Sequence, residues 1–415
     1  MRIAIIGAGA AGMMAAATIN EESPESKVFL IEKNDGLGKK VIISGGGRCN
    51  VTTGITDLKI VTRKYPRGEK FLMSSMHRFS PQDVRTWFES HGVPLKCEED
   101  LRVFPISNDG RDVVRAFENI FADSNTNILK RCAVQKIERN TANTSFVIHI
   151  KDQPEIEAEI VVLSLGGQAY RHTGSTGDGY TLAESLGHHI TPLAASLNSF
   201  ITTETWPATL SGVSFEHATI TAELEKEYSF TGPFLFTHRG ISGPAVFAMS
   251  SIIAFEDYNP QNSLQIFIDL LPDIKTDDLF IQIQNTIKEN LKKSFKTILH
   301  SYAPRSVIEV IEKEFSLRLE KKSAEISKKE IQAVIAKLKR LPVHAVGRGA
   351  GDEFVTAGGV KLEEVNPSTM ESLICPNLYF AGEILAIDGF TGGFNLQAAW
   401  ATGHAAGESI VNKLQ

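Results

Sequence analysis

The feature that most constrains this chain is a short apolar run that leads straight into a glycine-rich turn. Residues 3–6 are all apolar without alternation, as is typical of a parallel strand buried on both faces. The G-x-G-x-x-G spacing follows, at Gly7, Gly9, Ala10, Ala11 and Gly12. A second apolar run, 28–31, ends at Glu32. Strand, glycines, strand and acid in this order predict a Rossmann-like unit that binds a dinucleotide.

Each residue type in this unit has a separate physical role. Gly7 permits the tight turn, Gly9 lets the backbone approach a pyrophosphate, and Gly12 lets a helix pack close to the strand. A helix predicted over about 10–20 directs its free N–H groups at the phosphates. A carboxylate at Glu32 accepts hydrogen bonds from a ribose and repels a 2′-phosphate, so FAD or NAD fits better than NADP.

A second half-site stands near the other end of the chain. Residues 378–381 form another apolar run, which leads to Gly382 and Glu383, and a helix is predicted over 394–403. Gly392 and Gly393 precede that helix, and Phe394 and Asn395 are its first residues. A flavin's pyrophosphate, ribitol and ring need segments far apart in sequence, so the pair of half-sites predicts FAD. We expect Glu383 to bind ribitol hydroxyls and the helix dipole to stabilise the reduced ring.

A glycine-rich segment after Glu32 completes the predicted cofactor set. Its members are Lys33, Lys40, Ser44, Gly45, Gly46, Gly47, Arg48, Cys49 and Asn50. Three consecutive glycines suit a flavin ring or pyrophosphate, with Arg48 as an anion partner, although a glycine-rich surface turn is the alternative. Cys49 is either a nucleophile or, as the lack of a partner cysteine favours, a buried packing residue.

The segment from 133 to 187 is predicted to bring a further strand and loop to the cofactor. Strands are expected over 133–138, 145–150 and 156–165, and the last leads to Gly166 and Gly167. Asp178 lies in a further glycine-rich loop, where it either contacts the cofactor or caps a helix that runs to about 187. Upstream, Ser80 and Pro81 mark the start of a scaffold helix.

Composition narrows the class of protein. The 415 residues carry a formal net charge of −6, which gives no global reason to expect a nucleic acid or membrane partner. The apolar start of the chain could pass for a signal peptide or membrane span, but the glycine spacing and the polar residues 20–22 favour the strand-turn-helix interpretation. Four scattered cysteines exclude a redox dithiol or cysteine metal site and favour the cytoplasm; no metal is expected.

Changes in the pattern of residue types along the chain predict a domain inserted within an α/β fold. A Rossmann-like FAD-binding domain is expected over 1–191 and 354–415. A β-rich domain, an antiparallel sheet or small barrel, is expected over 192–271 and 342–353, with a helical subdomain over 272–341. In that subdomain one helix face is predicted at Val307, Ile308, Ile311, Phe315 and Leu319, and Ser327 with Glu330 forms a capping box.

Two features of the insertion are candidates for function. His238 and Arg239 lie in a polar, glycine-punctuated loop, and we predict them as general acid and anion clamp; a purely structural loop is the alternative. The helical subdomain is rich in lysine (Lys321, Lys322, Lys328, Lys329, Lys337, Lys339). These lysines are most simply a solvated face, and an RNA-contacting or partner-binding surface is the alternative.

Four strings in the chain carry a family resemblance. They are Ser44-Gly-Gly-Gly-Arg-Cys-Asn50, Leu235-Phe-Thr-His-Arg-Gly-Ile-Ser-Gly-Pro244, Thr356-Ala-Gly-Gly-Val360 and Gly392-Gly-Phe-Asn395. Together they resemble the BaiN-type family of NAD(P)/FAD-dependent oxidoreductases, also called YhiN-like or aminoacetone-oxidase-type flavoproteins. The resemblance covers essentially the whole chain. It implies a bacterial cytoplasmic flavoprotein with a β-rich insertion and a nested helical subdomain.

One position departs from the family pattern. Members often have an aspartate where this chain has Ala386, and Asp388 lies two residues further on. If that aspartate contacts flavin or substrate, this protein differs from its relatives or Asp388 compensates.

The leading functional hypothesis is an FAD-dependent oxidoreductase that acts on a small molecule, with NAD(P)H as its electron donor. No second strand-GxGxxG-helix unit follows Gly167, so NAD(P)H would bind without its own dinucleotide fold. The alternatives are an FAD-dependent RNA-modifying enzyme and a non-catalytic flavin-binding module with a protein partner. The sequence leaves the substrate, the donor and the oligomeric state open.

Overall fold

The computed structural model describes residues 1–142, 144–349 and 353–415, which divide into two compact units. Unit 1 comprises Met1–Ser196 and Glu353–Gln415, and unit 2 comprises Leu197–Asp352. Positions 350–352 of the predicted return segment lie outside the described residues. Each unit has its own apolar core.

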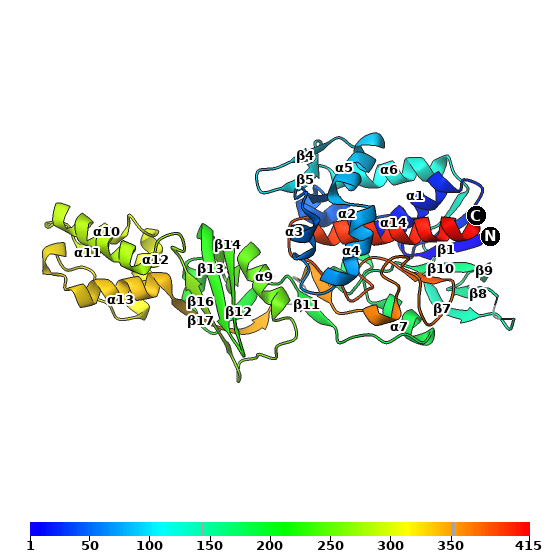
Figure 1. Ribbon diagram of the computed structural model, residues 1–415. Helices are drawn as coiled ribbons and strands as arrows, with labels where there is room; N and C mark the ends of the chain where they lie inside the picture. Colours follow the sequence, from blue (N-terminus) through cyan, green and yellow to red (C-terminus); the bar gives the residue numbers. More distant parts are fainter. Residues whose placement is uncertain (143, 350–352) are drawn as a thin grey trace. The chain divides into compact units, whose positions relative to one another are not determined.

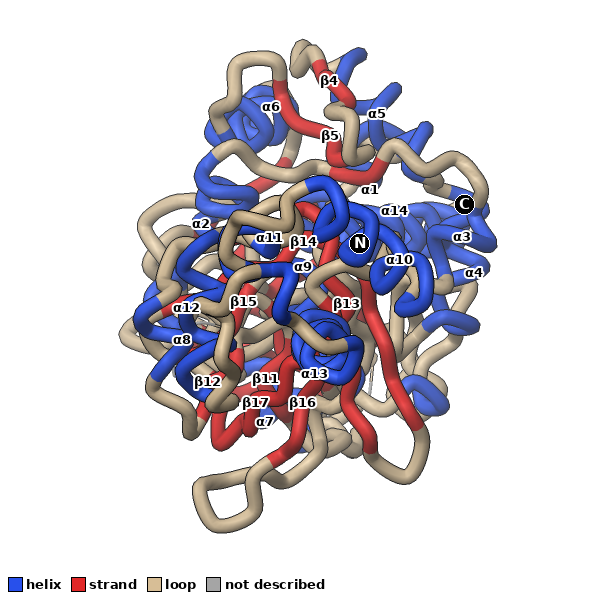
Figure 2. Tube along the Cα trace, turned by 90° about the vertical axis from the view of Figure 1, so that its left-hand side faces the viewer, coloured by secondary structure: helices blue, strands red, loops and turns tan. Residues whose placement is uncertain are grey.

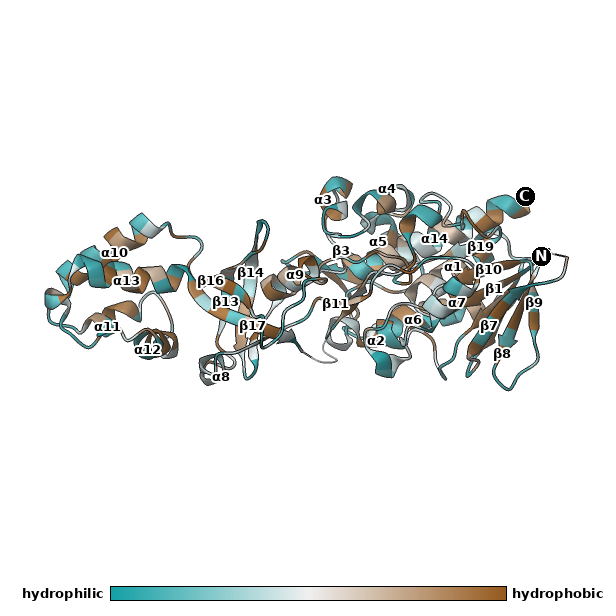
Figure 3. Cartoon of the chain, turned by 90° about the horizontal axis from the view of Figure 1, so that it is seen from below, coloured by the Kyte–Doolittle hydropathy of each residue, from teal (hydrophilic) through white to brown (hydrophobic). Residues whose placement is uncertain are grey.

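Unit 1 is built on a five-stranded parallel sheet in the order β19-β10-β1-β2-β6. Its strands are β1 (Arg2–Ile6), β2 (Lys27–Ile31), β6 (Thr126–Leu129), β10 (Ile160–Leu163) and β19 (Leu378–Phe380). The three strands β1, β10 and β19 are almost wholly buried, which explains their apolar runs without alternation (Figure 3). The predicted Rossmann-like sheet is confirmed.

The helices of unit 1 pack on this sheet or on the elements around it. They are α1 (Ala10–Glu22), α2 (Lys39–Ile43), α3 (Leu58–Thr62), α4 (Glu69–Arg78), α5 (Pro81–Ser90), α6 (Gly110–Ala122), α7 (Asp178–Ser185) and α14 (Phe394–Leu414), with short 3₁₀ turns at Ser44–Gly47, Arg171–Thr173 and Leu362–Glu364. The first and last of them, α1 and α14, lie side by side (Figure 1). Their approach is close because a Cβ on Gly403 would lie 2.4 Å from Ala11 O, and one on Gly407 would lie 3.0 Å from Ala15 O.

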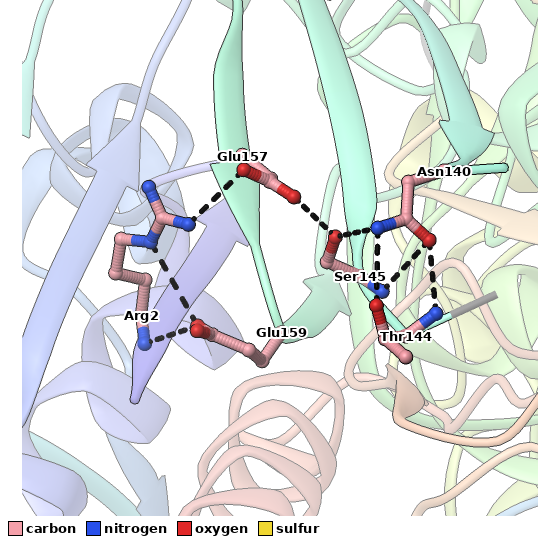
Figure 4. A network of polar contacts seen from close by, with 6 residues as sticks. All are labelled: Arg2, Asn140, Thr144, Ser145, Glu157 and Glu159. Carbon is pink, nitrogen blue, oxygen red and sulfur yellow. Dashed lines mark hydrogen bonds and ion pairs between the residues drawn. The ribbon is translucent and has the colours of Figure 1, made fainter. Parts of the chain in front are cut away.

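Small antiparallel sheets surround the parallel one. β3 (Thr52–Thr53), β5 (Arg102–Pro105) and β4 (Leu95–Cys97) form one; β7 (Val134–Arg139), β8 (Phe146–Ile150) and β9 (Ile156–Ala158) form another; β11 (Ala194–Ser196) pairs with β18 (Val355–Ala357). Arg2 at the start of β1 contacts Glu157 and Glu159, and Glu157 accepts from Ser145 Oγ at 2.6 Å (Figure 4). This network ties the edge of the second small sheet to the parallel sheet.

Unit 2 contains a closed antiparallel barrel in the order β12-β15-β14-β13-β16-β17 (Figure 2). Its strands are β12 (Phe200–Thr202), β13 (Ser214–Glu223), β14 (Glu227–Thr237), β15 (Gly240–Ser242), β16 (Leu264–Asp269) and β17 (Leu341–Arg348). Interior-facing residues such as Ile220, Phe236 and Ile266 are fully buried, and the alternation along β13 and β16 is that of a one-sided core. The predicted small barrel is confirmed.

The helices of unit 2 share the barrel's core. They are α8 (Trp206–Thr209), α9 (Pro244–Ile252), α10 (Thr276–Glu289), α11 (Phe295–Leu299), α12 (Arg305–Glu314) and α13 (Lys328–Lys339), with a 3₁₀ turn at Ser323–Glu325. One apolar cluster runs from Ile266 of the barrel to Leu338 of α13, and Leu270 N–H donates to Leu338 O at 2.9 Å. Within the described ranges, no helix of either unit combines the length and apolar character needed to span a bilayer.

Three predictions of secondary structure are wrong in detail. The helix predicted over 394–403 continues to Leu414 as α14. The strand predicted over 156–165 is two strands, β9 and β10, that join different sheets, because Glu159 between them turns to accept from Arg2 N–H. The helix face predicted to include Phe315 and Leu319 ends earlier, since α12 stops at Glu314 and Ser316 has a left-handed φ of +52°. Leu319 still packs into the core, from beyond the helix.

Candidate cofactor site

The turn between β1 and α1 places its glycines under different steric demands. A Cβ on Gly7, whose φ is +101°, would lie 2.7 Å from Ser164 O, and one on Gly12 would lie 1.9 Å from Gly7 O. Gly9 has an ordinary φ of −80°, and a Cβ there would meet no described atom within 4 Å. The chain therefore requires glycine at the first and third positions, whereas only a ligand close to the backbone would require it at Gly9.

The start of α1 fits an anionic ligand beside Gly9. Ala10 and Ala11 form its first turn, where backbone N–H groups have no partner within the helix. Two other predicted segments meet this turn: Gly38 N–H donates to Ala8 O at 2.9 Å, and a Cβ on Gly382 would lie 2.8 Å from Ala11 Cβ. The N-terminal and C-terminal half-sites thus adjoin in unit 1.

Glu32 is a buried carboxylate with partly satisfied oxygens. Its side chain is 8 % exposed. Oε2 accepts from Ala8 N–H at 2.9 Å, while Oε1 accepts from both Asn34 N–H and Asn34 Nδ2 at 2.8 and 2.7 Å. Because a carboxylate oxygen can accept two hydrogen bonds, Oε2 has capacity for a ligand hydroxyl.

Lys33 and Asp178 pair with one another. Lys33 Nζ lies 2.5 Å from Asp178 Oδ2 and donates to Thr176 Oγ1 at 2.6 Å. Asp178 is the first residue of α7, after the left-handed Gly177, and these partners lower its carboxyl pKa against the opposing effect of burial. Asn34 Nδ2 donates to Thr173 O at 3.0 Å, so residues 173–178 lie against the end of β2. Sequence reasoning missed Asn34 and Thr176, whose residue types give no signal.

A second polar cluster surrounds Glu383, just after β19. Lys40 Nζ donates to Glu383 Oε2 at 2.6 Å, and Thr356 N–H donates to Oε1 at 2.9 Å. A Cβ on Gly167 would lie 2.9 Å from Oε1, and the preceding Gly166 has a φ of +75°. The segments predicted at 40, 166–167 and 383 therefore converge.

Tyr180 of α7 is a buried hydroxyl that sequence reasoning did not single out. It is 4 % exposed, and among the described residues its Oη has no hydrogen-bond partner. Burial raises its pKa above the usual range, and the negative charge of Glu383 raises it further. A buried donor without a partner costs stability unless a ligand or water accepts from it, so Tyr180 marks space for a polar group beside this cluster.

The 44–50 segment forms a tight turn after α2. Gly45, Gly46 and Gly47 all have left-handed φ values, and added Cβ atoms on Gly46 and Gly47 would meet no described atom within 4 Å. Ser44 O accepts from Cys49 N–H at 2.9 Å, and Asn50 Oδ1 accepts from Val103 N–H at 3.3 Å. The two ends of the turn are held by these hydrogen bonds, and open space lies beside Gly46 and Gly47 but not beside Gly45.

The two side chains in this turn have protein partners. Arg48 donates to Glu98 Oε1 at 2.7 Å, and its guanidinium lies 3.8 Å from the centre of the Phe104 ring. Cys49 is fully buried, and burial raises its thiol pKa to about 12. Cys49 is therefore a neutral thiol at physiological pH, the state expected of a packing residue.

The start of α14 lies against the strand that follows the turn. A Cβ on Gly393, whose φ is +87°, would lie 2.3 Å from Thr52 O, and Gly392 also has a positive φ of +127°. Phe394 O accepts from Tyr65 Oη at 2.6 Å, and Asn395 exchanges hydrogen bonds with Gly389 at 2.8 and 2.9 Å. These contacts fix the direction in which the free N–H groups of the helix point.

A buried ion pair supports the loop that leads to α14. Asp388 is 1 % exposed; its carboxylate accepts hydrogen bonds from Arg67 Nε and, at 2.6 Å, from Arg67 Nη2, and Ser196 Oγ donates to it at 2.8 Å. Ala386 contributes its backbone N–H to Val360 O at 3.0 Å. Sequence reasoning raised Asp388 only as a replacement for the family aspartate and missed Arg67.

The two predicted catalytic residues lie in the other unit. His238 and Arg239 are exposed at the hairpin between β14 and β15, where Thr237 Oγ1 accepts from Arg239 N–H at 3.4 Å and Gly240 N–H at 3.1 Å. Their roles stay predictions.

Comparison with known proteins assigns this chain to a family. The family model described as HI0933-like protein Rossmann domain matches residues 1–409. The chain belongs to this family. The resemblance read from the four sequence strings is thereby confirmed.

Curated members of the HI0933-like family align over almost their entire length. The 3-dehydro-bile acid delta(4,6)-reductase of Clostridium scindens is 29 % identical, over 99 % of both chains. The ribosomal RNA dihydrouridine synthase of Haemophilus influenzae is 31 % identical over 98 % of this chain and 97 % of its own, and its Escherichia coli counterpart is 29 % identical.

Solved structures support the fold of this HI0933-like protein. A 3-ketosteroid-delta4-(5alpha)-dehydrogenase from Rhodococcus jostii matches with a TM-score of 0.52 at 14 % identity, over 99 % of this chain and 96 % of its own. A 3-ketosteroid delta1-dehydrogenase from Sterolibacterium denitrificans gives 0.52 at 13 % identity, over 99 % of both chains. At these identities the matches concern the fold alone.

Proposed function

We propose that this protein is an FAD-dependent oxidoreductase that adds hydrogen across a carbon–carbon double bond conjugated to a carbonyl group. The observation that carries the cofactor assignment is Gly9, a glycine that no described part of the chain requires, at the start of a helix and beside a buried carboxylate. The two half-sites that adjoin around it support FAD rather than a smaller nucleotide.

The reaction class is supported by what two relatives' names have in common. A 3-dehydro-bile acid with double bonds at positions 4 and 6 has them conjugated to its 3-carbonyl, and dihydrouridine differs from uridine by saturation of the double bond next to a ring carbonyl. Both reactions need a hydride at one carbon and a proton at its neighbour. Bound FAD supplies the hydride, which we propose it receives from NADH or NADPH.

Residues of unit 1 would hold the cofactor. In this proposal Gly7, Gly9, Ala10, Ala11 and Gly12 bind the pyrophosphate, Glu32 binds the adenosine ribose, and Glu383, oriented by Lys40, binds ribitol hydroxyls. The 44–50 turn and the start of α14 would border the ring, where N–H groups of the helix stabilise negative charge. His238 stays our candidate proton donor and Arg239 our candidate clamp for an anionic substrate group.

The Gly9→Ala variant tests the cofactor site without disturbing the fold. Its backbone conformation suits alanine and its Cβ meets no described atom, so the unfolding free energy should fall by less than about 1 kcal/mol. FAD binding should weaken at least tenfold because the methyl group occupies the space of the pyrophosphate. Calorimetric titration of the apo-protein with FAD measures this; an unchanged affinity would sink the assignment.

The reaction itself is tested by anaerobic mixing of the FAD-loaded protein with NADH and, separately, NADPH. We expect loss of flavin absorbance with one of them, and its return on addition of a 3-oxo-4,6-diene steroid or a uridine-containing RNA. A flavin that is not reduced by either nucleotide would contradict the proposed donor. Reduction without any reoxidation by either conjugated acceptor would contradict the proposed reaction class.

RNA is the second candidate substrate. Two relatives that align over at least 97 % of their own length are named for ribosomal RNA, and the helical region of unit 2 (272–341) has an excess of basic over acidic residues. Turnover with any conjugated acceptor would exclude the third hypothesis, a non-catalytic flavin-binding module.

A further inference from the structure

The charge of this protein is unevenly distributed. Residues 272–341 contain fifteen Lys and Arg against ten Asp and Glu, a formal charge of +5, although the whole chain carries −6. The rest of the chain therefore carries −11. Such an asymmetry within one chain indicates a region that meets an anionic partner.

The fold gathers most of this excess at one end of the helices. α10 leaves the barrel after β16 and α13 returns to it at β17, and the two helices pack against each other. The last turn of α10 and the first turn of α13 therefore both lie at the end remote from the barrel. Figure 3 shows this end in the colour of hydrophilic residues.

Backbone contacts bring two lysine-rich segments together at that end. Ser323 N–H donates to Lys293 O and Phe295 N–H donates to Lys321 O, both at 2.9 Å. Ser323 Oγ also donates to Asn290 O at 2.7 Å. Segments 288–293 and 321–329 thus form one continuous surface, which we call the basic tip.

The basic tip contains seven lysines and two acids. The lysines are Lys288, Lys292, Lys293, Lys321, Lys322, Lys328 and Lys329, and the acids are Glu289 and Glu325. Six of the lysines are exposed, and the seventh, Lys321, is half-buried against Glu330 at 2.6 Å. Among the described residues, Lys321 is the lysine of the tip with a carboxylate partner.

Lysines elsewhere in the same region serve the fold instead. Lys296 lies 2.8 Å from Glu312, and Lys339 lies 2.6 Å from Asp269 and donates to Leu271 O. Both side chains are largely buried, and their ion pairs explain why a lysine stands at each position. The charge of the tip has no such internal explanation.

We propose that the basic tip binds the phosphate backbone of a folded RNA, an inference that rests on RNA as the second candidate substrate. Ammonium groups from two adjacent segments can contact successive phosphates. The tip has no aromatic residue to stack on bases, so its contribution is affinity without sequence preference. Insertion into an anionic membrane is disfavoured because Leu291 is its one large exposed apolar side chain among the described residues.

The test is fluorescence anisotropy of the full-length, FAD-loaded protein with a labelled ribosomal RNA hairpin over a series of salt concentrations. The K292E/K293E variant should bind about 100-fold more weakly at ~0.1 M salt, about tenfold for each lost phosphate contact. The slope of log K against log salt should become shallower by about 2. The matched control K226E/K275E changes the same charge on exposed lysines of unit 2 outside the tip and should bind within a few fold of the unmodified protein.

Several results would overturn the proposal. They are the absence of RNA binding at low salt, equal weakening by both double variants, or binding to phosphatidylserine vesicles but not to the hairpin. Flavin content and flavin reduction by NAD(P)H, measured on the same samples, separate this from the proposed function. RNA binding by a protein whose flavin NAD(P)H does not reduce would support the basic tip and contradict the proposed electron donor.

Discussion

The two units of this protein use polar residues in opposite ways. The buried carboxylates of the described chain, Glu32 and Asp388, both lie in unit 1, where they accept hydrogen bonds from distant segments. The buried polar residues of unit 2 are uncharged, for example Asn198 and Ser250, and its ion pairs keep part of their surface exposed, as Lys339–Asp269 does. Burial of a carboxylate costs free energy. Because unit 1 buries two carboxylates beside the proposed cofactor site, their position there indicates a functional reason for that cost.

This comparison predicts that unit 1 is the more sensitive to loss of a single polar side chain. Asp388→Ala breaks a buried ion pair with Arg67 and should lower the unfolding free energy by about 3–5 kcal/mol. Denaturant unfolding of the apo-protein, followed by hydrogen exchange of unit 1 peptides, measures the loss. Asp35→Ala, which removes an exposed partner of Lys39, is the control and should have no measurable effect. Equal effects of the two would remove the contrast.

Unit 2 should respond most to loss of an apolar side chain. Leu338 of α13 is completely buried in the core shared by helices and barrel. Leu338→Ala should cost about 3 kcal/mol through the cavity it leaves, and faster exchange should be confined to unit 2 peptides. Gln332→Ala on the exposed face of the same helix is the matched control. Faster exchange in β1 or α1 would mean that the units do not unfold independently.

A polar contact of unit 2 should contribute less to the unfolding free energy than the buried side chain of Leu338. Ser327 caps α13, accepts from Glu330 N–H at 3.3 Å and is exposed. Ser327→Ala should cost about 1 kcal/mol by leaving a backbone N–H of the first turn without its partner. Ser327→Asp, which can cap in the same way, should restore the loss. A failure of aspartate to rescue would show that the capping bond is not the cause.

The smallest predicted effect is a pH dependence at the same cap. Hydrogen bonds from Lys321 and then from Ser327 lower the pKa of Glu330 to about 2, from 4.5 in an unfolded chain. The resulting stabilisation is complete above about pH 4.5 and is lost as the pH falls toward 2. The difference in exchange rate of α13 between wild-type protein and Glu330→Gln should therefore shrink between pH 6 and pH 3. A constant difference would refute the coupling.

How much was predictable from sequence differs between backbone and side chains. The parallel strands, the helix start at Ser80, the capping box at Ser327 and the small barrel follow from local patterns, since buried apolar runs, N-cap residues and alternation act over a few residues. The α14 helix runs to Leu414 rather than to about 403 because Gly403 packs on α1 instead of ending the helix. The Arg67–Asp388 pair joins residues 321 apart, and no local pattern encodes such a contact.

The close contact between α1 and α14 has a consequence for synthesis of the protein. The ribosome produces the Gly7–Gly12 turn first and the helix that packs against it only after residue 393. Unit 2 is complete before that and can fold while the chain is still being made. Until α14 has been synthesised, the apolar helix α1, which is buried from Ala10 to Asn20 in the finished protein, lacks the helix that packs against it. We therefore expect the nascent chain to need protection by a chaperone, and to gain the ability to retain FAD only when α14 has left the ribosome.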